Sequence, residues 1–268
     1  MNTRKDIINN YYSDVTKEDL RLNRTRHGQL EYLTTMHYIN KFFPKPCKVL
    51  EIGAATGRYS IALAKNGYDV VAIELGDNHF DLLNKRVNEL KNNKFKNIVA
   101  YKEDALNLTR FNDNTFDLTF LLGPMCHLYK KQDIMKAIWE AIRVTKSAGI
   151  VMTSFLSAHF LMLDRYYDNN RMNGIKETFT SNFKTRLSEK QIITRFDINE
   201  FESLFNELNV KHITTLTTDG IIKHIEDRGH LKMDDEEFNY FLKYHLNFCE
   251  KREMLGNSCH LLHICKKL

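Results

Sequence analysis

The stretch from Cys47 to Ser157 alternates short apolar runs with amphipathic segments, and this alternation restricts the fold more than any other feature of the chain. Apolar runs such as CKVLEIG and YDVVAIE are typical of strands that are buried on both faces of a parallel sheet. GRYSIALAKNG, which Gly67 stops, and DNHFDLLNKRVNELKNN, which Asp77 can cap, are helical in pattern. The alternation predicts βαβ units and an α/β fold with a doubly wound, mostly parallel sheet.

The same alternation continues beyond these segments. NIVAYKED and TFDLTFLLG predict two more strands, followed by a helix in KQDIMKAIWEAIRVTKSAG that ends before Gly149, and by the strand IVMTSFLS. DINEFESLFNELN has Asp197 and Glu200 at capping-box spacing and predicts another helix. KHITTLTT and SCHLLHICKK predict two final strands, so we expect an antiparallel C-terminal hairpin strand at one edge of the sheet.

Domain organisation follows from the scarcity of chain breakers. With 11 Gly, three Pro and no low-complexity run, the sequence predicts one domain over residues 1–268. We expect a core sheet with its helices in residues 45–157 and 196–268, and an N-terminal helical cap in residues 1–40. Residues 158–195 and 221–256 are rich in Phe, Tyr, Leu and His, and we expect them to be lid insertions on the substrate side.

Charge, cysteine usage and hydropathy narrow the class of function. The 39 Lys and Arg against 34 Asp and Glu are spread along the chain, which argues against a nucleic-acid partner because phosphate binding needs a concentrated basic patch. Five cysteines without CxxC spacing predict free thiols and no metal site. No run approaches the ~18 apolar residues of a membrane span, and the first residues lack the apolar core of a signal peptide. We therefore expect a cytoplasmic protein with no membrane partner.

The first strand ends in the turn EIGAATG, residues 51–57, at the edge where doubly wound sheets bind ligands. A dinucleotide site would show G-x-G-x-x-G, and a P-loop would place a lysine on the phosphates. Here the glycines are Gly53 and Gly57, no lysine follows, and Glu51 precedes them. A carboxylate at this point disfavours a pyrophosphate and suits a ligand that carries an ammonium group and a sulfonium.

These residues resemble the first motif of the class I S-adenosylmethionine-dependent methyltransferases, an acid followed by G-x-G-x-G. Ala55 replaces the middle glycine, which is tolerable if this residue keeps φ below zero. The resemblance covers about residues 45–160. It implies a Rossmann-like sheet, S-adenosylmethionine as the cofactor and S-adenosylhomocysteine as its product.

The resemblance also implies roles for individual residues. Glu74, 17 residues after Gly57, would bind the ribose hydroxyls, and Asp104 the adenine amino group. Tyr12 and Arg26 would reach the carboxylate of the cofactor from an N-terminal helix, although core packing is an equal alternative for Tyr12. The expected cofactor contacts are Tyr12, Arg26, Glu51, Gly53, Ala54, Ala55, Gly57, Glu74, Leu75, Asp104, Ala105 and Leu121.

FDLTFLLGPMCHL resembles the fourth motif of that family, which lines the transferred methyl group. His127 follows this loop and is the candidate general base, with a structural role as the alternative. Met125 separates Pro124 from Cys126, so Cys126 is expected to be a buried thiol and not a nucleophile. Nothing in the sequence ranks three further histidines that could reach the same pocket, His224, His230 and His245.

The expected function is transfer of a methyl group from S-adenosylmethionine to an O, N or S atom of a small molecule by in-line displacement. Two alternatives stay open. One is methylation of RNA by way of the scattered Lys and Arg. The other is a protein that binds the cofactor without turnover.

Overall fold

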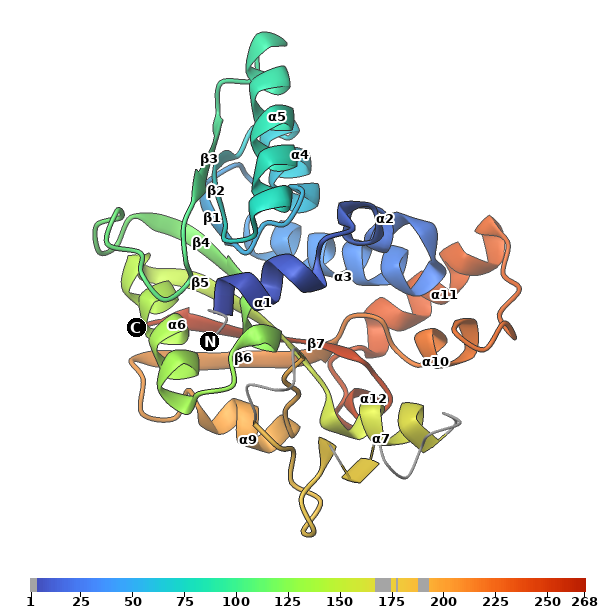
Figure 1. Cartoon of the computed structure of the whole chain (residues 1–268). Helices are drawn as coiled ribbons and strands as arrows, with labels where there is room; N and C mark the ends of the chain where they lie inside the picture. Colours follow the sequence, from blue (N-terminus) through green and yellow to red (C-terminus); the bar gives the residue numbers. More distant parts are fainter. Residues whose placement is uncertain (1–3, 167–174, 177, 188–192) are drawn as a thin grey trace.

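The computed structural model describes residues 4–166, 175–176, 178–187 and 193–268, and its centre is one seven-stranded sheet (Figure 1). The strand order is β3-β2-β1-β4-β5-β7-β6. β7 runs antiparallel to β5 and β6, while β1 to β5 are parallel to one another, so the predicted fold class is confirmed. The strands are β1 (Lys48–Ile52), β2 (Asp69–Glu74), β3 (Ile98–Lys102), β4 (Phe116–Leu121), β5 (Thr145–Leu156), β6 (Val210–Thr217) and β7 (His260–Lys267).

Helices cover both faces of the sheet because successive strand side chains point to opposite sides. Leu50 and Ile52 of β1 belong to a buried cluster with α6 and α9, whereas Val49 belongs to a second cluster with α3, α4 and α5. Apart from the short helix η1 (Pro124–His127), the helices are α1 (Arg4–Tyr11), α2 (Val15–Arg24), α3 (Arg26–Phe42), α4 (Arg58–Lys65), α5 (Asp77–Asn92), α6 (Lys131–Val144), α7 (Ala158–Tyr166), α9 (Ile198–Ser203), α10 (Ile222–Glu226), α11 (Asp235–Phe248) and α12 (Arg252–Leu255).

Two local predictions were wrong. The helix that was expected to run to Gly149 ends at Val144, because Thr145 is already extended and its buried hydroxyl bonds to Ala141 and Thr119. Asp77 does not cap α5. Gly76 is the N-cap, and the Asp77 carboxylate forms ion pairs with lysines of α1 and β3.

The segments added to the sheet lie on different sides of it. α1 lies over the turns that follow β2 and β3, where Arg4 pairs with Asp104 and Asn9 bonds to Asp77 (Figure 1). The insertion at residues 221–256, which holds α10 to α12, packs against α3 through Leu30, Ile222 and Phe238. In the other insertion, residues 158–195, α7 comes first, and residues 167–174, 177 and 188–192 lie outside the described part of the chain. Among the described helices, none has the length and apolar character that crossing a membrane requires.

Candidate cofactor and acceptor cavity

A cavity of about 350 Å³ opens at the carboxyl ends of β1, β2 and β4, which is the edge predicted from the sequence. Its wall combines the turns after these strands with side chains of α1, α2 and α3 and the start of β7. The volume is typical of a site for a small ligand.

The turn after β1 is held against the turn after β4. Gly53 has φ of 76°, and its N–H donates to the carbonyl of Ile73 at 2.9 Å. A Cβ on Gly53 would lie 2.6 Å from Cδ of Pro124, so only glycine allows the two turns to approach this closely. Gly57 has φ of 90° and begins α4 against Leu83, and it does not line the cavity.

Ala55 departs from the sequence expectation. The alanine was acceptable on the condition that φ stays below zero, whereas the residue has φ of 47°, in the left-handed region. Its N–H donates to Oε2 of Glu74 at 2.8 Å, and this bond helps to hold the strained conformation. The left-handed conformation costs a residue with a Cβ roughly 1–2 kcal/mol. Ala55 therefore keeps the backbone conformation of the glycine that the family carries at this position, at the expense of strain.

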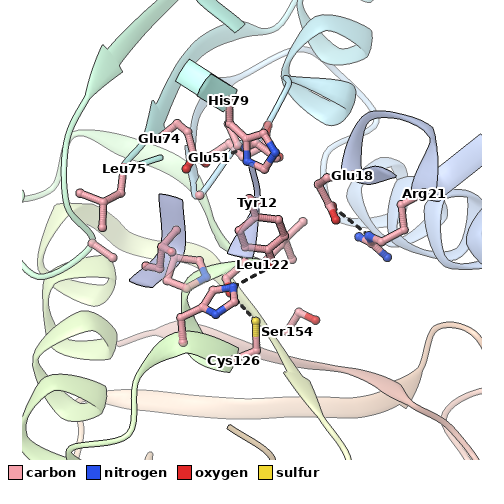
Figure 2. A pocket seen from close by; sticks show the side chains of 18 of the residues that line it. Tyr12, Glu18, Arg21, Glu51, Glu74, Leu75, His79, Leu122, Cys126 and Ser154 are labelled. Carbon is pink, nitrogen blue, oxygen red and sulfur yellow. Dashed lines mark hydrogen bonds and ion pairs between the residues drawn. The ribbon is translucent and has the colours of Figure 1, made fainter. Parts of the chain in front are cut away.

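Glu74 connects two turns beneath the cavity. Besides Ala55, it accepts a hydrogen bond from the N–H of Gly76 to Oε1 at 2.7 Å, and the residue is 7% exposed. His79 lies on the same wall, and its Nε2 is a buried nitrogen with no hydrogen-bond partner among the described residues. A ligand hydroxyl at this wall can satisfy both side chains, as Figure 2 shows them side by side.

Glu51 is the second buried acid of the cavity. It is 2% exposed and accepts a hydrogen bond from the hydroxyl of Ser60. Burial raises the pKa of Glu51 to about 8, against the opposing effect of the Ser60 hydrogen bonds. No described residue forms an ion pair with Glu51, so a ligand cation would be its first charged partner.

Asp104 and Ala105 lie on the wall where the resemblance expects adenine, together with Ala54 and Leu75. Asp104 forms an ion pair with Arg4 of α1 and accepts the N–H of Leu106 at 2.9 Å. The contact by Arg4 was not predicted, because nothing in the sequence ties residue 4 to residue 104.

Tyr12 and His127 meet in the same cavity, where the ring of Tyr12 also lies 5.0 Å from that of His79. The Tyr12 hydroxyl lies 2.9 Å from Nε2 of His127. Burial raises the pKa of Tyr12 above its ordinary value, so the phenol keeps its proton, and the tautomer of His127 sets which of the two groups donates. Cys126 also faces the cavity, as Figure 2 shows, and although burial alone would raise its pKa, the charge and hydrogen bond of His127 lower it.

Besides Gly57, two expected contacts lie elsewhere, and a neighbour takes the place of each. Arg26 does not line the cavity, because its guanidinium binds Asp235 at 2.7 Å; Arg21 lines it instead, between Glu18 and Glu31. Leu121 is fully buried in the core, and the next residue, Leu122, lines the cavity. Likewise, His224, His230 and His245 are not among the cavity residues.

His260, at the start of β7, is a cavity residue that sequence reasoning missed. Its Nδ1 lies 2.8 Å from Oδ2 of Asp219 and 3.7 Å from Oε2 of Glu31. Burial alone would lower its pKa, but Glu31, Cys259 and Asp219 together raise the pKa of His260 well above its ordinary value. Asp219 is fully buried and also accepts the backbone N–H groups of Cys259 and His260.

Comparison with known proteins agrees with this arrangement. Residues 49–149 match the family model described as a methyltransferase domain. A Bacillus subtilis protein named "Putative methyltransferase YqeM" is 25% identical over 116 residues, which are 43% of this chain. The matched region spans 44% of the length of that relative.

Two solved structures show the same fold over nearly the whole chain. One, from Thermotoga maritima, is described as a "SAM-dependent methyltransferase, possible histamine N-methyltransferase"; it has a TM-score of 0.61 at 17% identity and covers 98% of this chain and 99% of its own. The other is the [4+2]-cyclase SpnF, with a TM-score of 0.63 at 11% identity, covering 99% of this chain and 97% of its own.

Proposed function

Because residues 49–149 form a methyltransferase domain of the class I S-adenosylmethionine-dependent family, we propose that the chain transfers a methyl group from S-adenosylmethionine to an O, N or S atom of a small molecule. The observation that carries the proposal is the single cavity that the strand-end turns share with His127. The residues that are expected to bind the cofactor line this cavity, and so does the candidate base.

The residues present fit the cofactor. Glu74 has both carboxylate oxygens fixed by backbone N–H groups and keeps lone pairs for ribose hydroxyls, and the unpartnered Nε2 of His79 lies on the same wall. Glu51 would meet a cationic group of the cofactor, and Asp104 with Ala105 would border the adenine ring. We retain Tyr12 as a further residue that contacts the cofactor.

The cofactor supplies an activated methyl group on a sulfonium. The protein then has to align the acceptor, exclude water and accept a proton where the acceptor carries one. We assign the last task to His127, whose ring is fixed by the Tyr12 hydroxyl. Ile193 and Arg195 line the cavity, which supports a lid role for the end of the insertion at residues 158–195.

A small acceptor is favoured over RNA by the shape and charge of the site. The cavity lies beneath α1, and two of the arginines that line it are paired with carboxylates: Arg4 with Asp104, and Arg21 with Glu18 and Glu31. Paired cations leave little charge for a phosphate backbone. The description of the Thermotoga maritima protein, whose fold is similar, also names a small molecule.

The test is incubation of the chain with methyl-labelled S-adenosylmethionine and a cell extract, followed by separation into small-molecule, RNA and protein fractions. Label in the small-molecule fraction is the expected result, and label in an RNase-sensitive fraction would favour the RNA alternative. S-adenosylhomocysteine should raise the melting temperature, whereas NAD or ATP should not. Stabilisation by NAD or ATP alone would refute the cofactor assignment.

The similarity to a cyclase favours one second candidate, a cofactor-binding protein that does not transfer methyl groups. Tight binding of S-adenosylmethionine with no label in any fraction would support it. In that case His127 would serve a different reaction in the same cavity.

A further inference from the structure

His260 is the second histidine of the cavity, and its surroundings differ from those of His127. Asp219 occupies its Nδ1 at 2.8 Å, so only Nε2 can meet a ligand. The Asp219 carboxylate is itself held in place by hydrogen bonds, because Ser258 and the backbone N–H groups of Cys259 and His260 all donate to its Oδ1. The imidazole is therefore fixed from behind before any ligand binds.

The charge of His260 follows from its neighbours. Two carboxylates lie within 4 Å of Nδ1, at 2.8 Å from Asp219 and 3.7 Å from Glu31. Such a pair of anions favours the imidazolium over the neutral ring, in agreement with the raised pKa of His260. In the imidazolium both nitrogens are donors, so Nε2 offers an N–H to the ligand.

Two cations and three carboxylates lie around this N–H. Arg21 binds Glu31 through both terminal nitrogens and Glu18 through Nε, while His260 is paired with Asp219. A carboxylate ligand would be a fourth anion in this group, and an ammonium ligand has no lone pair to accept the N–H of His260. An uncharged oxygen can accept this N–H and adds no charge to the group.

We propose that His260 binds the methyl acceptor through a hydrogen bond from Nε2–H to an uncharged oxygen, so that the acceptor is a neutral molecule with a hydroxyl or carbonyl group. The assignment rests on the proposed methyltransferase function and adds the chemical class of its acceptor. Aromatic side chains on the same wall, those of Tyr59 and Phe155, suit the apolar remainder of such a molecule.

Three ring compounds of similar size separate the possibilities: benzamide is neutral, benzoate is an anion and benzylamine is a cation. Each is titrated into the full chain saturated with S-adenosylhomocysteine, and binding is followed by ligand-detected NMR. Benzamide should bind most tightly. Tighter binding of benzoate or benzylamine, or binding of none of the three, would overturn the proposal.

Variants then assign the contact. His260→Leu should weaken benzamide about tenfold or more, in line with loss of a hydrogen bond from a charged donor, and His260→Gln, which restores an N–H donor, should recover part of the affinity. His224→Gln, outside the cavity, is the control and should bind as the unmodified chain does. Unchanged benzamide affinity in His260→Leu contradicts the assignment.

A measurement on the unmodified chain covers the case in which His260→Leu does not fold. With ¹⁵N-labelled histidine, benzamide should shift the Nε2 signal of His260 and leave that of His245 in place, and a His260 signal that does not move counts against the proposal. Failure of S-adenosylhomocysteine to bind the unmodified chain would instead remove the proposed function itself.

Discussion

The phenol oxygen of Tyr12 lies 2.9 Å from Nε2 of His127, and this contact joins the chain just after α1 to the short helix after β4. It places an N-terminal residue beside the candidate base, in a cavity that Glu74 also lines. The N-terminal segment that carries Tyr12 thus borders both the expected cofactor site and the candidate base.

His127→Ala should lower kcat by about 10²–10⁴, the range of a general base, with S-adenosylhomocysteine affinity nearly unchanged. Steady-state kinetics on the acceptor found by labelling, with calorimetry for the affinity, measures both. His224→Ala is the control, since His224 lies outside the cavity. An unchanged kcat in His127→Ala would show that His127 is not a general base and that catalysis depends on aligning the acceptor with the methyl group.

Glu74→Ala should weaken S-adenosylhomocysteine binding by about 1–3 kcal/mol, through loss of the ribose contact and of the acceptor that orders the Ala55 turn. Isothermal titration calorimetry gives the affinity. Asp69→Ala, at the exposed beginning of the same strand, is the matched control. Equal affinity in both variants would remove Glu74 from the site.

Glu51 should make the ligand-free chain less stable as the pH rises. Its pKa is about 8 in the folded chain against an ordinary 4.5, so between these values the folded state binds more protons than the unfolded state. The free energy of unfolding therefore falls as the pH increases through this window, on the order of a few kcal/mol in total.

Denaturant titrations across that pH window measure this slope. In Glu51→Gln, which has no proton to lose and can still accept the Ser60 hydroxyl, the decline should be smaller by the contribution of this one group. The same slope in both proteins would show that other groups cause it.

Ala55→Gly should stabilise the chain by about 1 kcal/mol, because glycine adopts the observed φ of 47° without the strain that a Cβ causes. The Ala55 N–H bond to Glu74 is retained, so cofactor affinity should not fall. Urea unfolding provides the measurement. Ala62→Gly, inside α4, should have the opposite sign.

The sheet and the grouping of its strand-end residues could be predicted because parallel strands bring their carboxyl ends to one edge. Glu51, Glu74 and Asp104, far apart in sequence, were assigned to one site from their places at strand ends and from the family resemblance, and all three line the cavity. The sequence did not show which of the two arginines, Arg21 or Arg26, lines the cavity. This depends on Thr25, which separates α2 from α3 and caps α3 by accepting the N–H of Gly28, turning Arg26 away.

His260 was missed for a different reason. An antiparallel strand begins at the edge where its parallel neighbours end, so the first residue of β7 pairs with Leu156, the last residue of β5. The antiparallel hairpin was predicted, and applying the same edge rule to it would have brought His260 to the cavity. Arg4, by contrast, reaches Asp104 only through the packing of α1, which no local pattern specifies.

The position of β7 also affects the order in which the protein can fold during synthesis. β6 is made first, yet β7 lies between it and β5, so β6 has no neighbour in the sheet until β7 has left the ribosome. The half of the cavity built by β1, β2 and β4 needs only chain made much earlier. We expect the cofactor half to form before the wall that carries His260, and strand pairings this distant in sequence to limit the folding rate.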